Sequence, residues 1–118
     1  MAIQNEEKIW KLVDAKKEDF IELSDRVFDT PETLYNEFSS VSEHIATLEK
    51  EGFTITKNVC GMPTAVIGEA GNEGPVIAIL GEFDALPGLS QEPGVAAHSP
   101  VIEGCLLYTS PSPRDSCA

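Results

Sequence analysis

An unbroken run of five apolar residues, 76–80, limits the possible folds of this chain more than any other segment. It lies inside the stretch Gly-Pro-Val-Ile-Ala-Ile-Leu-Gly-Glu-Phe-Asp-Ala-Leu-Pro-Gly at residues 74–88. The run is long enough for a strand and too short for a helix, and glycine and proline mark its ends. Because no polar residue alternates with the apolar ones, it predicts a strand buried on both faces. Such strands occur in parallel or mixed sheets covered by helices, where ligands gather at the carboxyl ends of the strands.

Two acidic residues, Glu82 and Asp84, follow directly after this predicted strand. In an extended chain their spacing projects both carboxylates to one side, on the rigid support that a catalytic or metal-organising group needs. A simpler interpretation also fits, in which acidic side chains solvate the end of a buried strand. Spacing alone does not decide between the two, so the pair is a candidate site.

The first half of the chain predicts two helices. Apolar residues at roughly helical spacing predict a helix over residues 6–28, with Trp10 packing as an anchor near one end. A second helix is predicted from a Thr30 cap to a stop at Gly52. Pro31 suits its first position, and Glu32 places negative charge at the positive end of the helix dipole.

The pattern then changes to strands and turns. Residues 53–57 alternate as a half-buried strand does, residues 64–68 predict another strand, and residues 71–74 predict a turn into the apolar run. The order of these elements predicts the α/β class, with two N-terminal helices packed on a partial mixed sheet.

The other metal-ligating residue types are isolated in the sequence. His44 is expected to be a solvated residue of the second helix, His98 a lone imidazole in a loop, and Cys60 an ordinary thiol near a turn. The cysteine count is odd and shows no paired spacing, which indicates neither a disulfide framework nor a zinc ribbon.

Composition excludes several functions. The formal net charge of −12 over 118 residues argues against nucleic acid and anionic membranes as partners. No apolar run has the length of a signal peptide or a bilayer span, so a cytoplasmic protein is expected. Neither a phosphate-binding glycine loop nor a serine-hydrolase elbow occurs.

The segment Gly-Glu-Phe-Asp-Ala-Leu-Pro-Gly-Leu-Ser-Gln at residues 81–91 resembles the first active-site motif of the M20 metallopeptidase and amidohydrolase family. Residues 30–32, 49–53 and 61–66 add to the resemblance, which extends over roughly the first hundred residues. It implies an α/β catalytic domain with a smaller inserted domain. It also implies a dinuclear zinc or manganese centre that hydrolyses the amide of an N-acyl amino acid, a dipeptide or an aminobenzoyl-glutamate-like substrate.

Carried over residue by residue, the resemblance makes Asp84 the carboxylate that orients a metal-binding histidine. Glu82 occupies the place of a histidine ligand in the wider family, as in the amidohydrolase branch, and is implied to be a near-site residue. No residue of this chain is assigned as a metal ligand.

The likeness ends after Gly104, where Leu106 and Leu107 stand in place of the glycine and histidine of the next family motif. We therefore expect a partial catalytic domain over residues 1–104 and a non-native, unpacked tail over residues 105–118, similar to a translated junction sequence. Such a chain should be inactive by itself and should be poorly soluble or self-associate through its apolar run. Two alternatives stay open: a non-enzymatic module that binds a partner through a sheet edge, and a small doubly wound binding domain.

Overall fold

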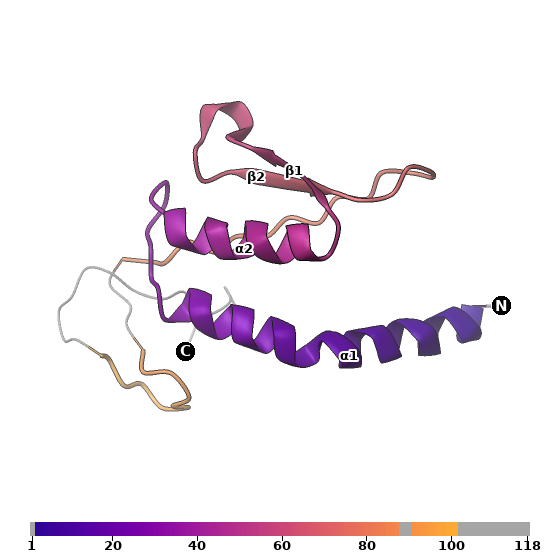
Figure 1. Ribbon diagram of the computed structural model, residues 1–118. Helices are drawn as coiled ribbons and strands as arrows, with labels where there is room; N and C mark the ends of the chain where they lie inside the picture. The colour runs from indigo at the N-terminus through magenta and orange to yellow at the C-terminus, as the bar shows by residue number, and fades with distance from the viewer. Residues whose placement is uncertain (1, 88–90, 102–118) are drawn as a thin grey trace.

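The computed structural model describes residues 2–87 and 91–101. Its elements are the helices α1 (Ala2–Phe28) and α2 (Phe38–Lys50), the strand β1 (Thr54–Lys57), the short 3-10 helix η1 (Val59–Gly61) and the strand β2 (Val66–Glu69). The two strands pair antiparallel, and α2 lies between this hairpin and α1 (Figure 1). The predicted α/β class with two helices and a sheet is thus confirmed; α2 packs on the strands and α1 packs on α2.

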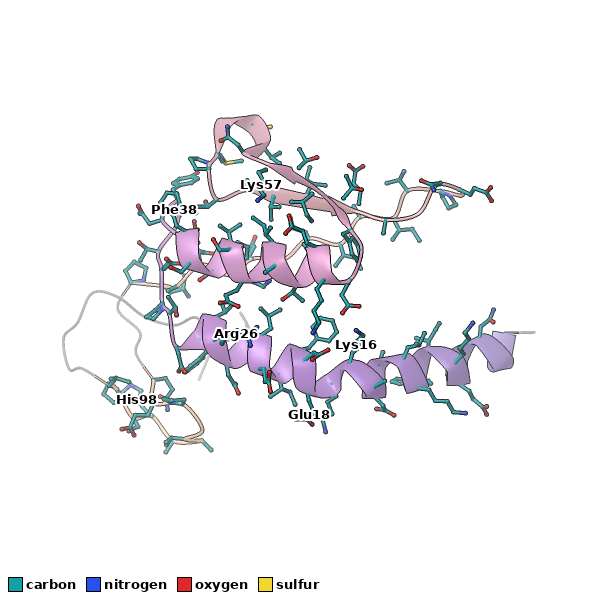
Figure 2. All side chains as sticks on the ribbon, viewed as in Figure 1. Lys16, Glu18, Arg26, Phe38, Lys57 and His98 are labelled. Carbon is teal, nitrogen blue, oxygen red and sulfur yellow. The ribbon has the colours of Figure 1, made fainter. Side chains whose placement is uncertain are left out.

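The two helices run antiparallel and are joined mainly at the surface. The Arg26 side chain donates to Glu43 at 2.8 Å, and Lys16 donates to Glu51 at 2.6 Å. Both cations project from α1 toward α2 (Figure 2). The apolar part of the contact is small, since Leu23 of α1 and Val41 of α2 are among the few buried apolar side chains.

The first half of α1 extends past the end of α2 (Figure 1). Trp10 is 61% exposed and Val13 is 55% exposed. The prediction that Trp10 packs as an anchor is therefore wrong. The helical spacing is real, but within the described residues no other element lies over this part of α1.

The second helix begins at Phe38, later than predicted. Thr30 does not cap it and Pro31 is not its first residue, because the chain between α1 and α2 makes an irregular connection in which Thr33 forms a parallel bridge with Ala85. The end of the helix is as predicted. Gly52 has a φ of +86°, which suits glycine, and the Phe53 amide donates to the Leu48 carbonyl at 3.0 Å, closing the last turn.

The hairpin packs on α2 close to Gly68. A Cβ at this position would lie 3.1 Å from Leu48 Cδ1 and 3.4 Å from Phe53 Cδ1. The absence of a side chain therefore lets β2 approach the helix. The two strands agree with the predicted ones to within two residues.

The apolar run of residues 76–80 is not a strand in the structure. Its backbone has no ladder partner among the described residues, and Val76 and Ile79 are 97% and 94% exposed. The predicted buried central strand, and with it the mixed sheet, is wrong for the described residues. After β2, glycines with positive φ at residues 71 and 74 lie in the turn that reverses the chain (Figure 1).

In the part of the chain that the structure describes, no helix combines the length and the apolar character that a membrane crossing requires.

Candidate functional site

The candidate site is carried by residues 82–86, which are held against the body of the protein at one backbone position. The Ala85 amide donates to the Glu32 carbonyl at 2.7 Å, and Ala85 pairs with Thr33 as an isolated parallel bridge. The Ala85 side chain is only 3% exposed. This short pairing places the end of the motif segment beside the connection between α1 and α2.

An aromatic contact fixes the same segment on α2. The ring centroids of His44 and Phe83 lie 4.6 Å apart, with the ring planes tilted by 42°. His44 is half-buried rather than solvated, so the expectation from sequence is wrong for this residue. Burial lowers the pKa of His44 below its ordinary value of 6.5, and the nearby Glu43 charge opposes the shift only in part.

The two predicted site carboxylates alternate along the chain with the two residues that hold this segment. Phe83 and Ala85 alternate with Glu82 and Asp84, and side chains of an extended chain alternate between two faces. Phe83 and Ala85 are the pair that contacts the protein. Glu82 is exposed and Asp84 is half-buried.

Glu32 supports this anchor at the start of α2. Its carboxylate accepts hydrogen bonds from the backbone amides of Ser39 at 2.9 Å and Ser40 at 2.8 Å. Burial pushes the pKa of the Glu32 carboxyl up, but the Ser40 and Ser39 hydrogen bonds outweigh it, so the pKa lies below its ordinary value of 4.5. The predicted negative charge at the helix N-terminus is therefore present, although Glu32 acts from outside the helix.

Two buried polar atoms on α2 and its cap have no hydrogen-bond partner among the described residues. They are Glu37 Oε2 and His44 Nε2. Seven residues are nearly two helical turns, so the two residues share one face of the helix. Glu37 is only 6% exposed, and its burial was not predicted from the sequence.

The described residues do not form a metal site by themselves. Within residues 2–87 and 91–101, no three histidine, cysteine or acidic side chains come together as a potential ligand set. His98 is exposed in a loop that Gln91 holds together by donating to the Ala97 carbonyl at 2.8 Å, and Figure 2 shows it away from the helices. Cys60 is a free, exposed thiol. The predicted tail, residues 105–118, and motif residues 88–90 lie outside the described part.

Two known proteins are similar in sequence to this chain. The chain is 45% identical over 93 residues to one of the subunits of p-aminobenzoyl-glutamate hydrolase of Escherichia coli, covering 78% of this chain and 19% of that protein. It is 35% identical over 85 residues to thermostable carboxypeptidase 2 of Saccharolobus solfataricus, covering 64% of this chain and 21% of that protein. A scan against protein-family models finds no match.

Both relatives are, by their names, hydrolases of the amidohydrolase and peptidase type. The chain belongs to the M20 amidohydrolase and peptidase family, as the motif at residues 81–91 predicts. It spans about a fifth of the length of the curated relatives that it matches.

Sequence reasoning located the two carboxylates but not the residues that hold them. The Glu32 carbonyl and the His44 ring are the main contacts of the motif segment, and neither role has a local sequence signal. Both depend on residues some forty to fifty positions apart in the chain. Alternation at residues 82–85 was the one available clue, since it puts Phe83 and Ala85 on the face opposite the carboxylates.

Proposed function

We propose that this chain supplies the Asp84-bearing part of an amidohydrolase active site. The proposed reaction is hydrolysis of the amide bond of an aminobenzoyl-glutamate-like substrate, an N-acyl amino acid or a dipeptide. The observation that carries the proposal is the motif segment itself, which is anchored through Ala85 and Phe83, the residues on either side of the half-buried Asp84. The 45% identity to an aminobenzoyl-glutamate hydrolase supports the choice of substrate class.

Each anchoring contact has a definite role in this proposal. The hydrogen bond from Ala85 to Glu32 fixes the backbone next to Asp84, and the packing of Phe83 on His44 fixes it on the other side. A carboxylate held from both sides can keep a basic partner group in one orientation and in one protonation state. Asp84 is thus proposed as a positioning residue, and Glu82 as a neighbour on the same face.

The proposal includes a requirement for a divalent metal, zinc or manganese. The described residues alone do not fit such an ion, because they contain no set of three potential ligands. We therefore assign no residue of this chain as a metal ligand and derive no step of the reaction from the metal. For the same reason the 118-residue chain by itself is expected not to hydrolyse amides. We also propose a cytoplasmic setting, in which an exposed thiol such as that of Cys60 stays reduced.

A chimera tests the function of Asp84 directly. The matching segment of the Escherichia coli relative would be replaced by the corresponding residues of this chain, and hydrolysis of p-aminobenzoyl-glutamate would be measured. We expect the chimera to be active and Asp84→Asn to lower kcat/KM about 10- to 100-fold. Glu73→Gln, a neutralisation at an exposed turn residue, should leave activity unchanged.

An Asp84→Asn chimera as active as its parent would rule out the positioning role. Metal content of both chimeras, measured after dialysis, separates a weakened metal site from a misfolded one, because misfolding also lowers the yield of soluble protein and its helix signal.

A different observation favours the alternative of a non-enzymatic module that binds a partner. The apolar run is exposed, with Val76 at 97% and Ile79 at 94%. Contiguous exposed apolar surface is typical of sites that bind another chain. An inactive chimera would favour the module over the hydrolase, whereas association of the 118-residue chain through this run fits both.

A further inference from the structure

The loop of residues 91–99 is held together from inside by one side chain, that of Gln91. The Gln91 carboxamide nitrogen donates to the carbonyls of Ala97 at 2.8 Å and Val95 at 3.1 Å. The carboxamide oxygen accepts a hydrogen bond from the Ser99 amide at 3.1 Å. A single side chain thus binds backbone groups in the middle of the loop and at its far end.

The two ends of the loop are also joined directly. The Glu92 amide donates to the Ser99 carbonyl at 2.8 Å, and the Ser99 hydroxyl donates to the Glu92 carboxylate at 2.9 Å. Gly94 has a φ of +74°, which lets the chain reverse between these ends. Residues 91–99 contain no helix or strand, so these hydrogen bonds alone give the loop its shape. Compact loops whose ends meet in this way often have a function.

The chemistry of the side chain explains why this position is a glutamine. A carboxamide carries two N–H donors and an acceptor oxygen, and the loop uses both kinds of group. Glutamate has nearly the same size but no donor, and it would place an acceptor against the carbonyls of Val95 and Ala97. Leucine fills a similar volume and forms no hydrogen bond. Neither residue could close the loop as glutamine does.

Gln91 is also the last residue of the family motif at residues 81–91. The same motif carries Asp84 and is fixed to the protein where the Ala85 amide donates to the Glu32 carbonyl. Six positions separate Ala85 from Gln91, so the two lie within about 22 Å of each other. The motif therefore fixes the backbone at one end and shapes the following loop at the other.

We propose that Gln91 is a positioning residue of the amidohydrolase, which holds residues 92–99 as a preformed wall of the substrate site. This role rests on the proposed function, because only a site for amide hydrolysis gives the wall a substrate. A loop that is already closed is not ordered at the expense of binding energy, so closure lowers KM. Asp84, which is proposed to orient a group that takes part in the reaction, should act on kcat instead.

Kinetics of the chimera with the Escherichia coli relative, built to include residues 82–99, test this role. We expect Gln91→Leu and Gln91→Glu to raise KM for p-aminobenzoyl-glutamate about 10-fold and to leave kcat within about twofold. Ala96→Ser, at an exposed position of the same loop, is the matched control and should change neither constant. The Ser99 amide should exchange with solvent faster in Gln91→Leu than in this control, because it loses its acceptor.

The outcomes separate this role from the proposed function. A fall in kcat at unchanged KM in the Gln91 variants would mean that Gln91 supports only the fold, and it would overturn the proposed wall. Unchanged kinetics would overturn it too, whether or not the Ser99 amide exchanges faster. Both results leave the proposed function standing if Asp84→Asn still lowers kcat/KM. A chimera that is inactive with Gln91 in place would overturn the proposed function and the wall with it.

Discussion

Residues 76–80 and residues 82–86 follow each other in the chain, yet only the second segment is held by the rest of the protein. Ala85 is 3% exposed and hydrogen-bonded to Glu32, whereas Val76 is 97% exposed. Hydrophobicity does not explain the contrast, because the exposed segment is the more apolar one. The difference lies in what each segment finds beside it.

The anchored segment finds two fixed partners. Thr33 offers a backbone edge, and α2 offers the face of the His44 ring. The apolar run finds neither among the described residues. A strand-forming sequence becomes a strand only where a second edge lies at the right distance, so the carboxylates of this chain are positioned by contacts downstream of the run rather than by the run itself.

The largest expected difference in the free energy of unfolding comes from replacing one alanine by leucine in each segment. Ala85→Leu forces a larger side chain into a filled space and should lower the free energy of unfolding by about 1–3 kcal/mol. Ala78→Leu, in the exposed segment, should change it by no more than about 0.5 kcal/mol. Urea unfolding of both variants at low protein concentration makes the comparison. Equal effects of the two substitutions would contradict the proposal that residues 82–86 are packed and residues 76–80 are not.

Removing the Glu32 carboxylate should come next in size. Glu32→Ala leaves two amides at the start of α2 without their acceptor and should destabilise the protein by about 0.5–2 kcal/mol near neutral pH. Because folding lowers the pKa of Glu32, its contribution is present above the ordinary value of 4.5 and is lost as the pH falls through the lower folded value. Unfolding measured against pH checks this.

Glu73→Ala, which removes an exposed carboxylate in a turn, is the control for Glu32→Ala. It should unfold like the original chain at each pH above 4.5. A Glu32→Ala variant that matches this control near neutral pH would mean that the two hydrogen bonds at the helix start contribute nothing to stability.

The contact between His44 and Phe83 should make a smaller, pH-dependent contribution. Folding lowers the pKa of His44, so its neutral form is favoured and the full stability is present above 6.5. Stability should fall as the pH drops below 6.5 and the unfolded chain takes up a proton that the folded chain resists. A His98→Asn variant leaves one imidazole, whose proton NMR signal reports this titration; a midpoint at 6.5 or above would argue against the buried ring.

The ion pairs between α1 and α2 should matter least. Arg26→Ala removes the exposed contact with Glu43, and exposed pairs contribute about 0.5 kcal/mol on average. Thermal unfolding should shift only slightly, and less in high salt than in low salt. A loss as large as that of Ala85→Leu would show that the helix pair depends on charge rather than on Leu23 and Val41.

Local sequence patterns predicted most of the elements. The helical spacing before Phe28, the glycine stop at Gly52 and the alternation of the hairpin are short-range signals, and each appears in the structure. The start of α2 was misplaced because Thr30 and Pro31 carry a valid cap signal, while the connection that holds them is decided by its pairing with Ala85.

The same limit applies to the site. Asp84 and Glu82 were found as the acidic pair of a family motif, but their support comes from Glu32 and His44, which only the fold brings near. The composition of the apolar run predicted burial, yet the run is exposed in the structure. Burial requires neighbouring segments, and a run of five residues does not specify them.

Hydrogen exchange resolved by residue distinguishes an anchored motif segment from the free apolar run that precedes it. In dilute solution, where copies do not pair, the Ala85 amide should exchange slowly because it donates to the Glu32 carbonyl at 2.7 Å. The amides of Ile77, Ala78 and Ile79 should exchange at nearly the rate of an unfolded chain. Equally fast exchange in both segments, or protection of the run at high dilution, would contradict this contrast between the two segments.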